Sequence, residues 1–292
     1  MTLFRRCLSF VLALWAMAAQ AQPVLVADLD WSEPVEGFGG WSGLALHDAG
    51  RRFVAISDRG RIVEGRILRD AAGTPTGLAP ERWDWLRNTE GQRMNRGRSD
   101  AEGLARRADG RLYVSFEGDH RVWTYPGIGT EAAWLQRPDA FRAFQGNSGM
   151  EGLALDARGW LYTLPERSGA TDRPFPVWRW RGASGWDQPF SIPREGLFLP
   201  TGLDIGPDGK LYLLERALVA FAFRTRVRRF TLTGTAIGDA ETVLETSAGR
   251  HGNLEGLSVW RDGTGAIRLT MIADDNFRSF QSTELVEYRL AR

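Results

Sequence analysis

Oxygen-bearing side chains recur around a short motif that ends in Gly-Leu, and they could hold a metal ion. The candidate ligands are Glu102, Glu151, Asn253, Glu255, Asp275 and Asn276. Carboxylates that gather in one place raise each other's pKa and repel, so they need compensating positive charge. A divalent cation supplies that charge, and ligand sets made only of oxygen suit calcium or magnesium. A divalent-cation site, with calcium as the first candidate, is therefore one prediction, and pairing of the acids with Arg59, Arg167 and Arg216 is the other.

Arginine and histidine side chains near these acids could complete an active site. Arg59, Arg167 and Arg216 each directly follow an acidic residue, so they either neutralise it or hold an anionic group of a substrate. His120 and His251 are the candidate general acid or base, because an imidazole titrates near neutral pH. The alternative for each is a solvated turn residue, which is the more common role of a lone histidine in a loop.

Several other kinds of catalytic chemistry are excluded by missing motifs. The single cysteine, Cys7, lies in the N-terminal leader described below, so the remaining chain has no thiol nucleophile and no disulfide. The sequence contains no Gly-x-Ser-x-Gly elbow, no His-Glu-x-x-His metal motif and no phosphate-binding P-loop.

The elements that must position these residues form a repeat. Five segments align on the glycines at positions 43, 103, 152, 202 and 256, at intervals of 49 to 60 residues. Each segment runs into a turn that contains aspartate and glycine and then into a second apolar strand, a pattern typical of a β-hairpin. Two weaker strands follow in the first four units, whereas the fifth unit offers only one, at residues 285–290.

This count predicts an all-β propeller with five blades of four strands. Residues 24–31 would supply the missing strand of the last blade, so that an N-terminal strand closes the ring and leaves no exposed edge. Six blades remain possible because the first interval is the longest. A solenoid of the same period is the other alternative, but it would not need the N-terminal strand.

Propeller topology brings the polar residues to one face. In a blade, the start of the innermost strand and the end of its neighbour lie at the same face, so the candidate ligands should ring one mouth of the channel. The same reasoning adds Asp58, Asp100, Glu117, Asp119, Glu166, Glu215 and Asp274. For Glu117, Glu166 and Glu215 a structural role in joining blades is as good an interpretation as a functional one.

Two other patterns have an ordinary structural interpretation. Four arginines between positions 224 and 229 alternate as on a strand, which suggests a solvated outer face. The Trp83–Trp85 and Trp178–Trp180 pairs fit outer strands that pack between blades, with a carbohydrate-stacking platform as the alternative.

The N-terminus predicts export. Arg5 and Arg6, an apolar run at residues 10–18 and Ala19-Gln20-Ala21 form a signal peptide over residues 1–21, which leaves one propeller domain over residues 22–292. We expect a periplasmic or secreted monomer with no membrane span after cleavage. Cleavage leaves 35 basic and 36 acidic side chains, a balance that argues against a nucleic-acid or membrane-surface partner. We expect a small-molecule substrate or ligand as the partner.

The motifs together resemble the "esterase-like activity of phytase" family of bacterial propeller proteins. The resemblance covers roughly residues 40–290 and rests on Asp100-Ala-Glu-Gly-Leu-Ala, Tyr113-Val-Ser-Phe-Glu-Gly, Leu214-Glu-Arg, Asn253-Leu-Glu-Gly-Leu, Ala273-Asp-Asp-Asn-Phe and Gln281-Ser-Thr-Glu-Leu. It implies an exported hydrolase of an ester or phosphoester. A more distant similarity to calcium-dependent propeller lactonases implies that a ring of Glu, Asn and Asp holds the metal.

The sequence thus predicts a metal-assisted hydrolase that acts on an ester, phosphoester or lactone bond at the channel mouth. With Lys210 as the only lysine, the chain departs from alkaline propeller phytases, whose sites combine carboxylates with lysines. The alternative is a non-catalytic propeller that binds a small ligand or an envelope protein, because fold does not dictate function.

Overall fold

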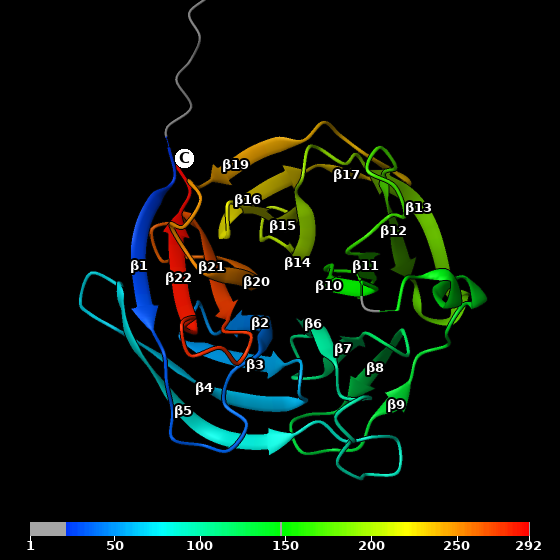
Figure 1. Cartoon of the computed structure of the whole chain (residues 1–292), viewed down its shortest axis with the longest axis horizontal. Helices are drawn as coiled ribbons and strands as arrows, with labels where there is room; N and C mark the ends of the chain where they lie inside the picture. Colours follow the sequence, from blue (N-terminus) through cyan, green and yellow to red (C-terminus); the bar gives the residue numbers. More distant parts are fainter. Residues whose placement is uncertain (1–21, 147, 292) are drawn as a thin grey trace, which may run out of the picture.

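Five four-stranded antiparallel sheets form a ring around a central channel (Figure 1). The computed structural model describes residues 22–146 and 148–291. The predicted signal peptide, residues 1–21, lies outside the described residues. The ring confirms the predicted all-β propeller. It has five blades, so the alternative of six blades is wrong.

The blades follow one another along the chain, each written here from the innermost to the outermost strand. Blade 1 contains β2 (Trp41–His47), β3 (Arg52–Ser57), β4 (Arg61–Arg69) and β5 (Pro75–Trp85). Blade 2 contains β6 (Ala101–Arg106), β7 (Leu112–Phe116), β8 (Arg121–Tyr125) and β9 (Ala133–Trp134). Blade 3 contains β10 (Met150–Leu155), β11 (Leu161–Pro165), β12 (Phe175–Trp180) and β13 (Trp186–Ile192).

Blade 4 contains β14 (Leu199–Ile205), β15 (Leu211–Val219), β16 (Ala222–Phe230) and β19 (Glu241–Glu245), and the short β17 (Leu232–Thr233) and β18 (Ala236–Ile237) form a separate hairpin. Blade 5 contains β20 (Asn253–Arg261), β21 (Ile267–Asp274), β22 (Glu284–Arg289) and β1 (Val24–Asp30). Two 3₁₀ segments, η1 (Asp139–Ala143) and η2 (Gly182–Ser184), are the helical elements of the described residues. In this part of the chain no helix has the length and apolar character needed to cross a membrane.

The N-terminal strand closes the ring, as the sequence predicts. β1 runs antiparallel to β22, with Val24 opposite Arg289 and Asp30 opposite Glu284. Figure 1 shows the two strands side by side near the C-terminus. This pairing covers the outer edge of β22, which would otherwise be free to pair with another chain.

The repeated glycines are required by close contacts between innermost strands. A Cβ atom on Gly103 would lie 2.6 Å from the carbonyl oxygen of Glu151, and one on Gly152 would lie 2.4 Å from the Cβ of Leu203. The same contact recurs from each blade to the next and finally from Gly256 back to Leu44 of blade 1. The repeated glycine therefore lets five strands approach one another around a narrow channel.

Tryptophans of the outer strands pack within and between blades. Trp83 lies 6.1 Å, between ring centroids, from both Trp31 and Trp41, and all three belong to one apolar cluster. Trp178 meets Phe141 edge to face at 5.4 Å. These contacts favour the packing interpretation of the tryptophan pairs over a carbohydrate platform.

The expectation of a solvated outer face for the arginine run is wrong for Arg226 and Arg228. Both side chains are buried and donate hydrogen bonds to the buried carboxylate of Glu215. Glu195 accepts further hydrogen bonds from the same two arginines, at 3.0 and 2.8 Å. Strand alternation puts Arg226 and Arg228 on one face of the blade, and the acids facing them make burial possible because a buried charge must be paired.

Candidate functional site

A bulge in each innermost strand positions the residue that precedes the repeated glycine. The register with the second strand shifts at this point in all five blades. Such bulges redirect a side chain. In blades 1 and 4 the bulged residues are Ser42 and Thr201, whose hydroxyl groups donate hydrogen bonds to carbonyl oxygens of the next blade, those of Ala101 and Leu254. These two positions therefore help to join the blades.

In the other three blades the same position holds a glutamate. Burial, together with the charges of Glu151 and Glu255, raises the pKa of Glu102 well above its ordinary value. Burial also raises the pKa of Glu151, and Glu117, Glu166 and Glu255 contribute to that shift. Carboxyl groups from blades 2, 3 and 5 therefore lie close enough to influence one another's pKa.

Asp100 and Glu117 extend this group in blade 2. Asp100, Glu102 and Glu117 each offer a carboxylate oxygen within 4.8 Å of the other two. Glu117 also accepts a 2.7 Å hydrogen bond from the backbone N–H of Gly149 in the segment that leads into β10, so it links blades 2 and 3. Burial raises the pKa of Glu117 to about 7.

Asp58 and Asp274 add two more carboxyl groups from blades 1 and 5. Burial and nearby acids raise the pKa of Asp58 to about 7 and that of Asp274 to about 8. The Oδ1 atom of Asp58 is buried and has no hydrogen-bond partner among the described residues. A Cβ on Gly40 would lie 2.1 Å from this oxygen, so the glycine keeps space beside the carboxylate.

Arg216 is the guanidinium that lies among these acids. It donates hydrogen bonds to Glu255, to Asn253 at 2.6 Å and to Glu166 at 3.3 Å. Although burial opposes the shift, the carboxylates of Glu255, Glu151 and Glu166 raise its pKa. Asn253 in turn donates a 2.8 Å hydrogen bond to Glu255, so these side chains hold one another in place.

The donor set fits a divalent cation. The acids at the mouth outnumber the basic groups that face them: they are Asp58, Asp100, Glu102, Glu117, Glu151, Glu166, Glu255 and Asp274. Such a group must either bind protons, as the raised pKa values indicate, or bind a cation. All the donors are oxygen atoms, the type that calcium and magnesium prefer.

The structure brings four of the six predicted metal ligands together, namely Glu102, Glu151, Asn253 and Glu255. Asp275 instead accepts N–H hydrogen bonds from Gly40 and Phe277, both at 3.0 Å, and so stabilises the turn that follows β21. Asn276 is exposed in the same turn and donates to Gln281. The same group of carboxyls includes four acids that the repeat predicts at the mouth but not as ligands: Asp58, Asp100, Glu117 and Asp274.

The three predicted substrate-binding arginines differ in their surroundings. Arg216 donates its hydrogen bonds to the acids described above. The guanidinium of Arg59 lies 3.0 Å from the ring centroid of Phe277. Arg167 is exposed beside Glu166 and lines a hollow of about 220 Å³ with Arg194 and Gln145. The guanidinium groups of Arg59 and Arg167 therefore have fewer hydrogen-bond and ion-pair partners than that of Arg216.

The two predicted catalytic histidines are both buried. His120 packs so closely on Gly149 that a Cβ at position 149 would lie 2.0 Å from its ring, and burial lowers its pKa. His251 lies in the loop before β20, but its polar neighbours are Asp28, Glu284 and Tyr288 on the two outer strands of blade 5. The structure thus places His251 apart from the carboxyl groups at the mouth.

Comparisons with known proteins agree with the fold and point to one family. The family model described as "Phytase-like: Esterase-like activity of phytase" matches residues 36–277. Among solved structures, a luciferin-regenerating enzyme is 10% identical with a TM-score of 0.51, covering 92% of this chain and 95% of that chain. An endo-arabinase from Bacteroides thetaiotaomicron is 11% identical with a TM-score of 0.51, covering 94% and 98%. At such identities these likenesses show the fold alone. No match was found among curated proteins.

Proposed function

Because the chain belongs to the family described as esterase-like activity of phytase, we propose that it is a metal-assisted hydrolase whose active site is the acidic channel mouth. The family suggests hydrolase-type chemistry. The finer proposal is that the protein cleaves an ester, phosphoester or lactone bond of a small-molecule substrate. The observation that carries it is the group of buried carboxyls with raised pKa values, gathered from blades 1, 2, 3 and 5 around the channel.

Glu102, Glu151 and Glu255 would hold the cation, with Asp100 and Asn253 supporting them. Calcium is the first candidate because all the donors are oxygen atoms. A bound cation would polarise the carbonyl or phosphoryl oxygen of the substrate and lower the pKa of water.

Proton transfer is assigned to two carboxyl groups beside the proposed ligands. Without a cation, burial raises the pKa of Glu117 to about 7. A bound cation would lower that pKa and leave a carboxylate that can take a proton from water. Burial raises the pKa of Asp274 to about 8 without a cation, so Asp274 is the candidate proton donor to the leaving group. His120 would support Gly149, whose N–H orients Glu117, rather than contact the substrate.

Substrate orientation is assigned to the arginines at the rim. Arg59 and Arg167 could hold an anionic group because their guanidinium groups are less fully committed than that of Arg216. Arg216 would instead fix Glu255 and Asn253 in position. We further propose that the protein acts in the periplasm or outside the cell as a monomer, which rests on the signal peptide predicted at residues 1–21.

The proposal is tested by hydrolysis of an aryl ester, an aryl phosphate and a chromogenic lactone, each with calcium and with a chelator. Turnover that the chelator abolishes and calcium restores would support the proposal and identify the bond class. Absence of turnover on all three, with calcium and with other divalent ions, would overturn it in favour of a propeller that only binds a ligand.

A further inference from the structure

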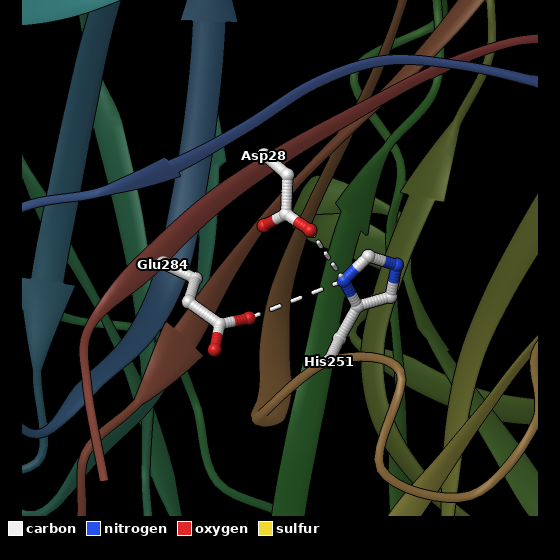
Figure 2. A group of neighbouring side chains, drawn as sticks. All are labelled: Asp28, His251 and Glu284. Atoms are coloured by element: carbon white, nitrogen blue, oxygen red, sulfur yellow. Dashed lines mark ion pairs between the residues drawn. The ribbon is translucent and has the colours of Figure 1, made fainter.

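A second group of potential metal ligands lies in blade 5, separate from the group of Asp100, Glu102 and Glu117. Figure 2 shows His251 facing Asp28 of β1 and Glu284 of β22. The Nδ1 atom of His251 lies 3.3 Å from Oδ2 of Asp28 and 4.0 Å from Oε2 of Glu284. One ligand atom from each residue lies within 4.8 Å of the others. We call these three residues the closure cluster because they join β1, the strand that closes the ring, to the rest of blade 5.

His251 is buried, and one of its ring nitrogens faces the two carboxylates. The residue is only 5% exposed, and its Nδ1 atom is buried with no hydrogen-bond partner among the described residues. Its other nitrogen, Nε2, lies 2.7 Å from the hydroxyl oxygen of Tyr288. In the tautomer in which Nε2–H donates to that hydroxyl, the lone pair of Nδ1 faces the two carboxylates, as it would in a metal ligand.

Apart from His251, Arg250 is the basic side chain paired with Asp28 among the described residues. Its Nη1 atom lies 3.3 Å from Oδ2, but the side chain is 44% exposed. This long exposed side chain can leave Asp28 at little cost.

We propose that Asp28, His251 and Glu284 bind a transition-metal ion, with Zn²⁺ as the candidate. One imidazole with two carboxylates is a ligand set of zinc, whereas calcium and magnesium take oxygen ligands alone. Tyr288 would hold the imidazole in the orientation that presents Nδ1, the way a hydrogen bond on the far nitrogen orients a metal-binding histidine. Glu284 is held by the N–H of Gly252 at 3.0 Å. Partial exposure of Asp28 and Glu284 gives the ion access from solvent.

The ion would connect three separate parts of the chain: β1, β22 and the loop before β20. Since β22 is the strand with which β1 pairs, a metal bound here would stabilise the closed ring over any state in which β1 has come away. This role is independent of the proposed hydrolase site, because none of its ligands belongs to the mouth.

The test is a titration of the EDTA-treated full-length protein with Zn²⁺, followed by calorimetry and by the thermal unfolding midpoint. We expect one equivalent to bind and the midpoint to rise. Asp28→Asn and Glu284→Gln should each weaken binding at least about tenfold and abolish the rise. His251→Gln should have the same effect. Because this substitution removes a buried ring, the variant could fail to fold, and the two carboxylate variants then decide the test.

Glu102→Gln, which alters the mouth, and His47→Gln, which alters a partly exposed histidine, are the controls and should both keep the Zn²⁺ response. Co²⁺ gives a second readout, because a ligand set of this kind produces a visible absorption band that Asp28→Asn should remove. A Zn²⁺ response that persists in Asp28→Asn and Glu284→Gln, or no response in the unaltered protein, would overturn the proposal. Loss of the response in Glu102→Gln alone would assign zinc to the mouth and overturn it equally.

Discussion

The guanidinium of Arg69 and the carboxylate of Glu287 lie face to face between blades 1 and 5, joined by hydrogen bonds of 2.8 and 2.9 Å. Glu287 has no exposed surface and also accepts from Thr270 at 3.0 Å and Arg268 at 3.3 Å. The pair therefore bridges the boundary at which the first and last blades meet.

Glu287→Gln should destabilise the protein strongly. It leaves two guanidinium groups beside a neutral amide in a buried site, and breaking a buried ion pair by removing one partner costs about 3 kcal/mol or more. Urea unfolding monitored by fluorescence measures the change. The control is Glu81→Gln, since Glu81 pairs with Arg52 and Arg66 on the exposed surface and should matter little. Equal unfolding midpoints for the two variants would contradict the argument.

Gly103→Ala should destabilise the ring without any change of charge. The added methyl would lie 2.6 Å from the carbonyl oxygen of Glu151 and 2.7 Å from the Cβ of Leu153, and neither can move without shifting blade 3. Overpacking of this kind costs about 1–3 kcal/mol. Gly263→Ala is the matched control because no atom lies within 4 Å of its added methyl. The same urea experiment compares them, and an unaltered midpoint for Gly103→Ala would show that the channel is wider than described.

Stability without added metal should fall as the pH rises from about 4 to about 8. Folding raises the pKa of Asp58 and Glu117 to about 7 and that of Asp274 to about 8, so the folded protein binds more protons than the unfolded chain in this window. Under that condition the unfolding free energy decreases with increasing pH. Denaturant titrations with a chelator at several pH values test this. Asp274→Asn should flatten the slope, and a slope of the opposite sign would contradict the assignment.

Glu102→Gln should abolish most of the hydrolase activity and leave the fold intact. The amide is a weaker cation ligand than the carboxylate, and loss of such a ligand lowers activity by about 100-fold. Because the change removes one of several like charges, the thermal unfolding midpoint should stay the same or rise at neutral pH. Steady-state kinetics with and without calcium measure the effect, with the exposed Glu131→Gln as the control. Undiminished turnover, or an unfolded variant, would remove Glu102 from the site.

The fold was largely predictable because each repeat carries its own local signals. The strand expected at residues 285–290 is observed as Glu284–Arg289, and the closing strand expected at residues 24–31 is observed as Val24–Asp30. Turn residues and alternating apolar residues fix such elements within a few positions. The repeat also implied that Glu102, Glu151 and Glu255 share one mouth. Glu102 and Glu255 line one space between the innermost strands, and the charge of Glu151 raises the pKa of Glu102.

The parts that sequence reasoning missed depend on contacts between distant segments. Nothing near His251 in the sequence shows that Asp28 and Glu284 will be its neighbours, because they arrive through the pairing of the first strand with the last. Burial of Arg226 and Arg228 was missed for a similar reason, since Glu195, one of the acids that satisfy them, lies in another segment. The turn that engages Asp275 is likewise defined by Gly40, far away in the chain.

The antiparallel pairing of β1 with β22 also constrains the order of folding. Val24 and Arg289 are partners although nearly the whole chain separates them, so this contact carries the largest loop-closure entropy in the molecule. During synthesis β1 precedes the other strands, and it stays unpaired until β22, the last strand, has been made. Folding should therefore end with a slow docking of this strand, and a chain interrupted before Glu284 would expose an unpaired β1 to other molecules.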